Sequence, residues 1–152
     1  MVKSGVLETG TAQSPEACLT MLHLSAATGN LKGYFGQFAI NGVFLGTDPH
    51  ERWTSKEFLE AYKEYFDGTP AWIYTLRGGT RNIYHACETF VTFDELLDSQ
   101  DFGCISKGSG VMVKKGENWY ILQYNLSFSV PNDLAVGVDG ICQQIAHYQA
   151  DS

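Results

Sequence analysis

The order of its segments constrains this chain most: helical patterns come first, and nearly everything from Ala71 to Val130 has the pattern of β-strands. The expected strands are 72–84 with a break at Gly78-Gly79, 87–97, 105–115 and 119–130. Helices followed by strands joined through short turns are typical of an α+β domain with its helices on one face of an antiparallel sheet. We therefore expect an α+β fold in which a curved antiparallel sheet wraps around N-terminal helices.

Capping motifs mark where the first helices begin. Ser14 is the expected cap of a helix with proline at its first position. A short second helix is expected over 31–38. Thr54 and Glu57 form a capping box for a third helix, which carries Phe58, Leu59, Tyr62, Tyr65 and Phe66 on one side.

Two weaker patterns complete the expected order. Asn41-Gly42 predicts a turn before a strand over 43–47. After Pro131, a C-terminal helix is expected, with Leu134, Val138, Ile141 and Ile145 on one stripe. At 152 residues the chain has the length of one domain, so we expect a flexible tail over 1–13 and a single domain over 14–152.

Charge and hydropathy exclude several kinds of partner. The net charge is −7, with 10 Lys and Arg against 17 Asp and Glu, so the basic patch that binds nucleic acid or anionic membrane is not expected. No apolar run approaches the roughly 20 residues of a membrane-spanning helix. Because no apolar signal core follows Lys3, we expect a cytoplasmic protein.

Neither a metal nor a cofactor is expected. The four cysteines are widely spaced, which favours free thiols over a zinc or redox motif. Asp48, His50 and Glu51 lack the spacing of a known metal motif. The glycines of 77–81 and 108–110 do not lead from a strand into a helix, as a phosphate-binding loop requires.

The last strand indicates how the sheet faces its surroundings. One alternating set is apolar or aromatic and should face the helices: Tyr120, Leu122, Tyr124, Leu126 and Phe128. The other set has mixed polarity, so we predict a homodimer through the outer sheet face, with Trp119, Ile121, Gln123 and Asn125 near the contact. Two alternatives remain: the protein is a monomer, or Gln123 and Asn125 face an interior pocket instead of the dimer contact.

The preceding strand points to that pocket between sheet and helices. Gly108 and Gly110 would leave space on the inner face. A small apolar ligand could bind there. The side chains expected to line the pocket are Trp53, Tyr62, Phe66, Met112 and Tyr124.

Three ionisable residues are candidates for catalysis. Asp48 either forms the turn with Pro49 or borders the pocket, and the face it shares with Phe44 favours the pocket. His23 lies on the apolar face of the first helix, as a core residue or a second titratable group. Of Asp94 and Glu95 only one can face the interior, and we expect Asp94, either free or paired with Arg52 or Arg77.

Several motifs resemble a known family. The stretches GTDPHERW, FDELLD, KGSGVMVKKGENWYILQYNLSF and PND are similar to the SnoaL-like group of the nuclear-transport-factor-like (ketosteroid-isomerase-like, cystatin-like) cone fold. The resemblance extends from about Pro15 to Asp133 and implies the cone fold, which hosts isomerases, cyclases, dehydratases, epoxide hydrolases and non-catalytic modules. Asp48-Pro49 is similar to the motif that supplies the isomerase general base.

The family's complete catalytic sets have no match in this chain. The aspartic acid of the isomerase oxyanion hole falls where Gly108, Gly110 and Met112 stand, and the inward acid of the polyketide cyclases corresponds to Leu126. We therefore expect a small-molecule-binding domain, non-catalytic or of uncharacterised activity. The alternative is an acid–base isomerase, cyclase or lyase for an apolar carbonyl substrate, with Asp48 as base and His23, Asp94 or Tyr124 as donor.

Overall fold

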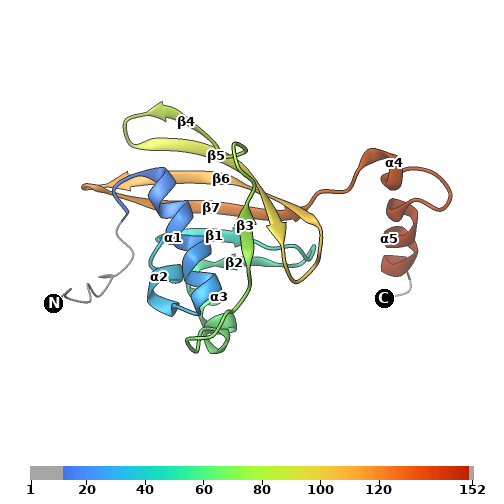
Figure 1. The fold of residues 1–152 in the computed structure, drawn as a ribbon, viewed down its shortest axis with the longest axis horizontal. Coiled ribbons are helices and arrows are strands. Elements are labelled where there is room, and N and C mark those ends of the chain that lie inside the picture. The colour runs from blue at the N-terminus through green and yellow to red at the C-terminus, as the bar shows by residue number, and fades with distance from the viewer. Residues whose placement is uncertain (1–11, 151–152) are drawn as a thin grey trace.

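The computed structural model describes residues 12–150. Three helices and a short 3-10 turn lie on one side of a curved sheet, and two C-terminal helices extend beyond it (Figure 1). The helical elements are α1 (Pro15–Thr28), α2 (Leu31–Phe35), α3 (Ser55–Tyr62), η1 (Lys63–Tyr65), α4 (Asn132–Ala135) and α5 (Ile141–Ala150). The strands are β1 (Phe38–Leu45), β2 (Arg52–Thr54), β3 (Tyr74–Leu76), β4 (Asn82–Cys87), β5 (Phe90–Ser99), β6 (Ile105–Lys115) and β7 (Asn118–Phe128).

The strands form one sheet in the order β2-β1-β7-β6-β5-β3, with β4 also paired to β5. All pairs are antiparallel except β1 with β7, which is parallel. The α+β prediction is therefore confirmed. Of the tail expected over 1–13, residues 1–11 lie outside the described residues, but Ala12 is buried and forms a bridge with Trp119, so the tail prediction fails at Ala12.

The predicted caps are present where the helices begin. The Ser14 side chain accepts a hydrogen bond from the Ala17 amide, and Thr54 and Glu57 form the reciprocal capping box. The strand boundaries differ more from expectation. Asn41-Gly42 lies inside β1 at an irregularity in its pairing with β7 instead of forming a turn. The strand expected over 72–84 is divided into β3 and β4 at the predicted break, Gly78-Gly79, although β4 continues to Cys87.

A β-bulge changes which side chains of β7 face the core. Met112 pairs with Ile121 and Val111 pairs with Gln123, so β7 has one extra residue, Leu122, at this point. Residues on either side of the bulge therefore alternate in opposite phase. Trp119 and Ile121 are buried in the core, which corrects their expected place on the outer face. Tyr124 and Leu126 are buried as predicted.

Aromatic side chains fill the space between sheet and helices. Phe44 and Phe58 stack with ring centroids 4.2 Å apart, and Tyr34 contacts Phe38, Phe58, Phe66 and Trp72. Gly110, which was expected to leave space on the inner face, adds no cavity, because a Cβ there would lie 1.9 Å from the Gln123 carbonyl oxygen. The interior is thus a packed core, and any cavity must lie at its margins.

The expected C-terminal helix is interrupted after its first turn. The pattern from Leu134 to Ile145 is divided between α4 and α5 (Figure 1). No residue of α5 is buried. Among residues 12–150, no helix is long and apolar enough to cross a membrane.

Candidate functional site

The inner face of β5 places one carboxylate inside the protein. Val91, Phe93, Glu95, Leu97 and Ser99 alternate inward and are all buried. Glu95 is 1% exposed, whereas Asp94 is exposed and accepts a hydrogen bond from Asn82. The expectation that Asp94 faces the interior is therefore wrong, because the alternation of β5 directs it to the outer face.

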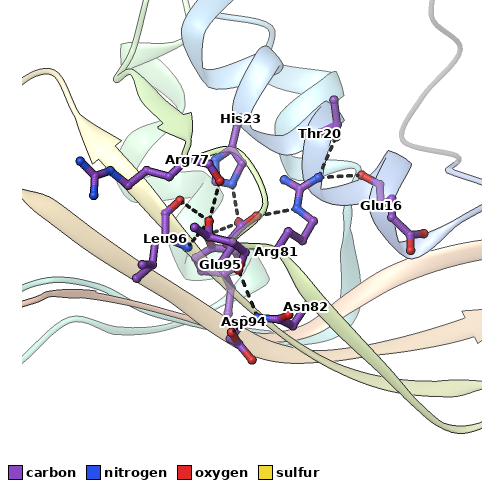
Figure 2. Close-up of polar contacts among 11 residues, drawn as sticks. Glu16, Thr20, His23, Arg77, Arg81, Asn82, Asp94, Glu95 and Leu96 are labelled. Atoms are coloured by element: carbon purple, nitrogen blue, oxygen red, sulfur yellow. Dashed lines mark hydrogen bonds and ion pairs between the residues drawn. The ribbon is translucent and has the colours of Figure 1, made fainter.

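Three side chains from distant parts of the chain surround the Glu95 carboxylate. Figure 2 labels two of them, His23 and Arg81. His23 Nε2 of α1 lies 2.6 Å from Oε1, and the Tyr124 hydroxyl of β7 donates to the same oxygen at 2.9 Å. Arg81 Nε donates to Oε2 at 2.7 Å. We call these four residues the Glu95 cluster. His23, predicted as a core residue or a second titratable group, is thus hydrogen-bonded to a buried carboxylate. That carboxylate is Glu95 with Arg81 as its cation, where Asp94 with Arg52 or Arg77 was expected.

Burial and contacts within the cluster set the protonation states of Glu95 and Tyr124. Burial alone would raise the pKa of Glu95, but hydrogen bonds and charges from His23 and Arg81 outweigh it and bring the pKa below its usual value. Burial, followed by the Glu95 charge, raises the pKa of Tyr124 well above its usual value. Near neutral pH the cluster therefore holds an ionised carboxylate and a neutral phenol.

Two further contacts fix the cluster in place. Arg81 Nη1 donates to Thr20 Oγ1 at 2.9 Å and to the Glu16 carbonyl at 3.3 Å, which ties the cation to α1. Gly108 provides room for the phenol, because a Cβ there would lie 2.2 Å from the Tyr124 hydroxyl oxygen. The space predicted at Gly108 exists, but Tyr124 fills it.

A second set of functional groups surrounds a depression at the end of the sheet near the β1–β2 connection. It has a volume of about 210 Å³. Its lining is Phe44, Gly46, Thr47, Glu51, Phe58, Tyr62, Trp72, Tyr74, Phe102 and Leu126. We call it the Glu51 depression, because Glu51 is its only ionisable carboxylic acid. Most of its wall is aromatic or aliphatic, as in small-molecule sites.

Asp48 does not line this depression. Its side chain is exposed and accepts a hydrogen bond from the His50 amide at 2.9 Å, the local turn that Asp commonly makes. The expectation that Asp48 borders the pocket is therefore wrong. Glu51 takes that place: Oε2 accepts from the Asp48 amide, and Oε1 accepts from the Tyr62 hydroxyl at 2.8 Å.

Local geometry favours Glu51 in this position. A Cβ at Gly46 would lie 2.1 Å from Glu51 Oε2. Only glycine at this position therefore leaves room for the Glu51 carboxylate beside the end of β1. Burial, with the hydrogen bond to Glu51 next, raises the pKa of Tyr62 to about 12. Tyr62 is thus a neutral donor beside a carboxylate, a pair suited to acid–base chemistry.

Of the five predicted ligand-contacting residues, only Tyr62 lines the depression. Phe66, Met112 and Tyr124 are buried in the core, and Trp53 packs edge-on against Tyr62 behind the wall. The aromatic side chains of Trp53, Phe66 and Tyr124 therefore pack against residues that line the depression instead of lining it themselves.

Comparison with known proteins identifies the family. The SnoaL-like domain profile matches residues 16–131, more than half of the chain. The chain belongs to the SnoaL-like domain family. No curated protein matches it significantly.

Solved structures share the fold of this SnoaL-like domain at low sequence identity. An NTF2-like protein of unknown function from Pseudomonas putida has a TM-score of 0.61 at 9% identity, covering 78% of this chain and 86% of that chain. An NTF-2-like protein of unknown function from Shewanella oneidensis has a TM-score of 0.58 at 15% identity, covering 72% and 93%. A protein from Novosphingobium aromaticivorans, provisionally named a scytalone dehydratase, has a TM-score of 0.58 at 11% identity, covering 82% and 88%.

Glu95, Arg81 and Glu51 were not predicted from the sequence, and they differ in the signal that the sequence carries for them. Glu95 continues the alternation of Val91 and Phe93, so the apolar pattern of its own strand could have assigned it inward. Arg81 and Glu51 lie in connections between strands, where no periodicity signals direction. Among residues 12–150 of this SnoaL-like domain, no group of His, Cys, Asp or Glu is placed to hold a metal ion, and the four cysteines are free.

Proposed function

We propose that this SnoaL-like domain binds a small, largely apolar molecule in the Glu51 depression. The observation that carries the proposal is a mainly apolar wall with one carboxylate–phenol pair, Glu51 and Tyr62. Ligand sites combine apolar walls with a few oriented polar groups in this way. Because typical sites measure about 300–1,000 Å³, a volume of about 210 Å³ fits a ligand of one or two rings.

Binding of 2-acetylnaphthalene, a neutral bicyclic ketone, tests this proposal. The titration is followed by tryptophan fluorescence, since Trp72 lines the depression. We expect saturable binding that Phe102→Ala weakens roughly tenfold, because an aromatic wall contact contributes on the order of 1.4 kcal/mol. Tyr84→Ala, at an exposed aromatic residue of β4, is the matched control and should leave affinity unchanged. Equal affinities in both variants would contradict the proposal.

Acid–base catalysis on a bound carbonyl compound is the second candidate, favoured by the 2.8 Å Tyr62–Glu51 hydrogen bond. Glu51 replaces Asp48 as the base, and the Tyr62 hydroxyl, which donates to Glu51 in the free protein, would turn its proton to the carbonyl oxygen of a bound ketone. The same ketone distinguishes catalysis from binding alone, because enolisation exchanges its methyl protons with deuterium from the solvent. Exchange detected by NMR that Glu51→Gln abolishes, with binding retained, would support an enzyme; binding without exchange would support a binding module.

We further propose a homodimer through the outer face of the sheet. Val111 and Val113 lie on that face beside Tyr120, and Gln123 and Asn125 border them, while Trp119 and Ile121 belong to the core. Half-exposed apolar side chains at the centre of a polar face are typical of an interface. This arrangement supports the predicted dimer with Gln123 and Asn125 retained at the contact. Val111, Val113 and Tyr120 take the place of Trp119 and Ile121.

Sedimentation at tens of micromolar measures the expected dimer. Val111→Asp should yield a folded monomer, because it places a charge at the centre of the proposed contact. Val138→Asp, at an exposed valine outside the sheet, is the control and should stay dimeric. A wild-type monomer, or a dimer that Val111→Asp leaves intact, would contradict the assembly.

A further inference from the structure

A second cavity lies between α1 and the segment that carries β3. Its volume is about 270 Å³, and its apolar walls include Leu24, Ala27, Ile73 and Leu76. Two members of the Glu95 cluster, His23 and Arg81, also line it. We call it the α1–β3 groove. It is distinct from the Glu51 depression, although Tyr74 lines both.

The groove gives a ligand access to an oriented imidazole. Glu95 is ionised and can only accept hydrogen bonds, and it also accepts one from Tyr124, so the nitrogen that faces it, His23 Nε2, carries a proton. In neutral His23 the unprotonated nitrogen is then Nδ1. Within residues 12–150, no hydrogen bond engages Nδ1. A carboxylate that fixes an imidazole through one nitrogen prepares the other nitrogen to act as a base.

Four charged or titratable side chains surround His23: Glu95, Arg81, Tyr124 and Tyr74. Glu95 of β5 and Arg81, just before β4, cancel each other's charge at 2.7 Å. Tyr124 of β7 and Tyr74 of β3 are neutral phenols, since burial raises the pKa of both. An imidazolium formed at His23 would therefore remain paired with the Glu95 carboxylate.

We propose that the α1–β3 groove is a second ligand site, which takes a small aromatic molecule with an acidic hydroxyl group and in which His23 Nδ1 accepts the hydroxyl proton. The ligand O–H bond breaks, an N–H bond forms at Nδ1, and the electron pair remains on the phenolate oxygen. The apolar walls fit the aromatic ring, and the imidazolium that forms at His23 stabilises the phenolate by its charge. A carboxylic acid fits less well, because it is already ionised near neutral pH and has no proton to donate.

The probe 4-nitrophenol tests both binding and proton transfer, because its phenolate is yellow and its neutral form is not. At a pH below the pKa of the free probe, we expect the bound probe to show the phenolate absorbance. His23→Gln keeps an amide donor for Glu95 but removes the base. This variant should bind roughly tenfold more weakly and hold the probe in its neutral form.

Substitutions on the walls locate the probe. Ala27→Trp fills the α1–β3 groove and should abolish binding, whereas Tyr84→Ala on β4 should not alter it. The proposal is overturned if millimolar 4-nitrophenol does not bind. It is also overturned if the spectrum and affinity of the bound probe are the same in wild type and His23→Gln, or if Ala27→Trp still binds the probe. Loss of binding on Phe102→Ala alone would place the probe in the Glu51 depression and would also overturn it. Because the ketone and phenol titrations use different cavities, either proposal can fail without the other.

Discussion

Replacing Glu95 with alanine is expected to lower the free energy of unfolding by about 3–5 kcal/mol. The substitution leaves Arg81 without its carboxylate and the buried Tyr124 hydroxyl without its acceptor. Breaking a buried ion pair by removing one partner is among the costliest single changes, because the remaining charge stays desolvated. His23 also loses the group that orients it.

Urea denaturation measures this effect, with Asp94→Ala as the matched control. The two acidic residues are adjacent on β5, but Asp94 is exposed and bonded only to Asn82. Asp94→Ala should therefore change stability by about 0.5 kcal/mol or less. Equal and small effects of the two substitutions would show that the Glu95 cluster contributes little to folding.

The pH dependence provides a second readout of the same residue. The pKa of Glu95 is lower in the folded protein than its usual value of about 4.3. Its charge therefore stabilises the fold above the unfolded-state pKa, and this contribution is lost as pH falls through the folded-state pKa. Titrating from about pH 5 to about pH 3, we expect the stability difference between wild type and Glu95→Gln to shrink, since both proteins share all other carboxylates.

The sequence predicted the layers and the helix starts because these depend on local chemistry. The Ser14 cap and the Thr54 capping box act within one helical turn, and both are present. The bulge in β7 depends instead on how two strands meet. Since residues 119–122 alternate between apolar side chains on both faces, a change of phase at Leu122 leaves no trace in the polarity pattern.

Prediction of the candidate site was limited for a related reason. Asp48 and Glu51 lie in the same connection, and either could reach the sheet's edge from sequence alone. What decides between them is the missing side chain at Gly46, which lets the Glu51 carboxylate approach β1. The Glu95 cluster unites α1, β5, β7 and the loop before β4, and contacts across that sequence distance follow from the assembled fold.

Gly108→Ala should also have a large effect, because it brings a methyl group against Tyr124 inside the Glu95 cluster. The added Cβ would lie 2.2 Å from the Tyr124 hydroxyl oxygen, 2.9 Å from its Cζ atom and 3.2 Å from Glu95 Cγ. The phenol must move, and its hydrogen bond to Glu95 is lost with it. We expect a loss of about 2–3 kcal/mol in the free energy of unfolding, as for other overpacked cores.

The double variant Gly108→Ala/Tyr124→Phe identifies the cause of that loss. Tyr124→Phe alone should cost about 1.5–3 kcal/mol, since it removes a hydrogen bond to a charged group. It also removes the oxygen that the new methyl group meets, so the combined cost should be smaller than the sum of the two by about 1 kcal/mol or more. Gly78→Ala, where a Cβ meets open space, is the control and should be nearly neutral. Strict additivity would mean that Gly108 is required for the backbone of β6 and not for the room it gives Tyr124, and the steric account of the cluster would then be wrong.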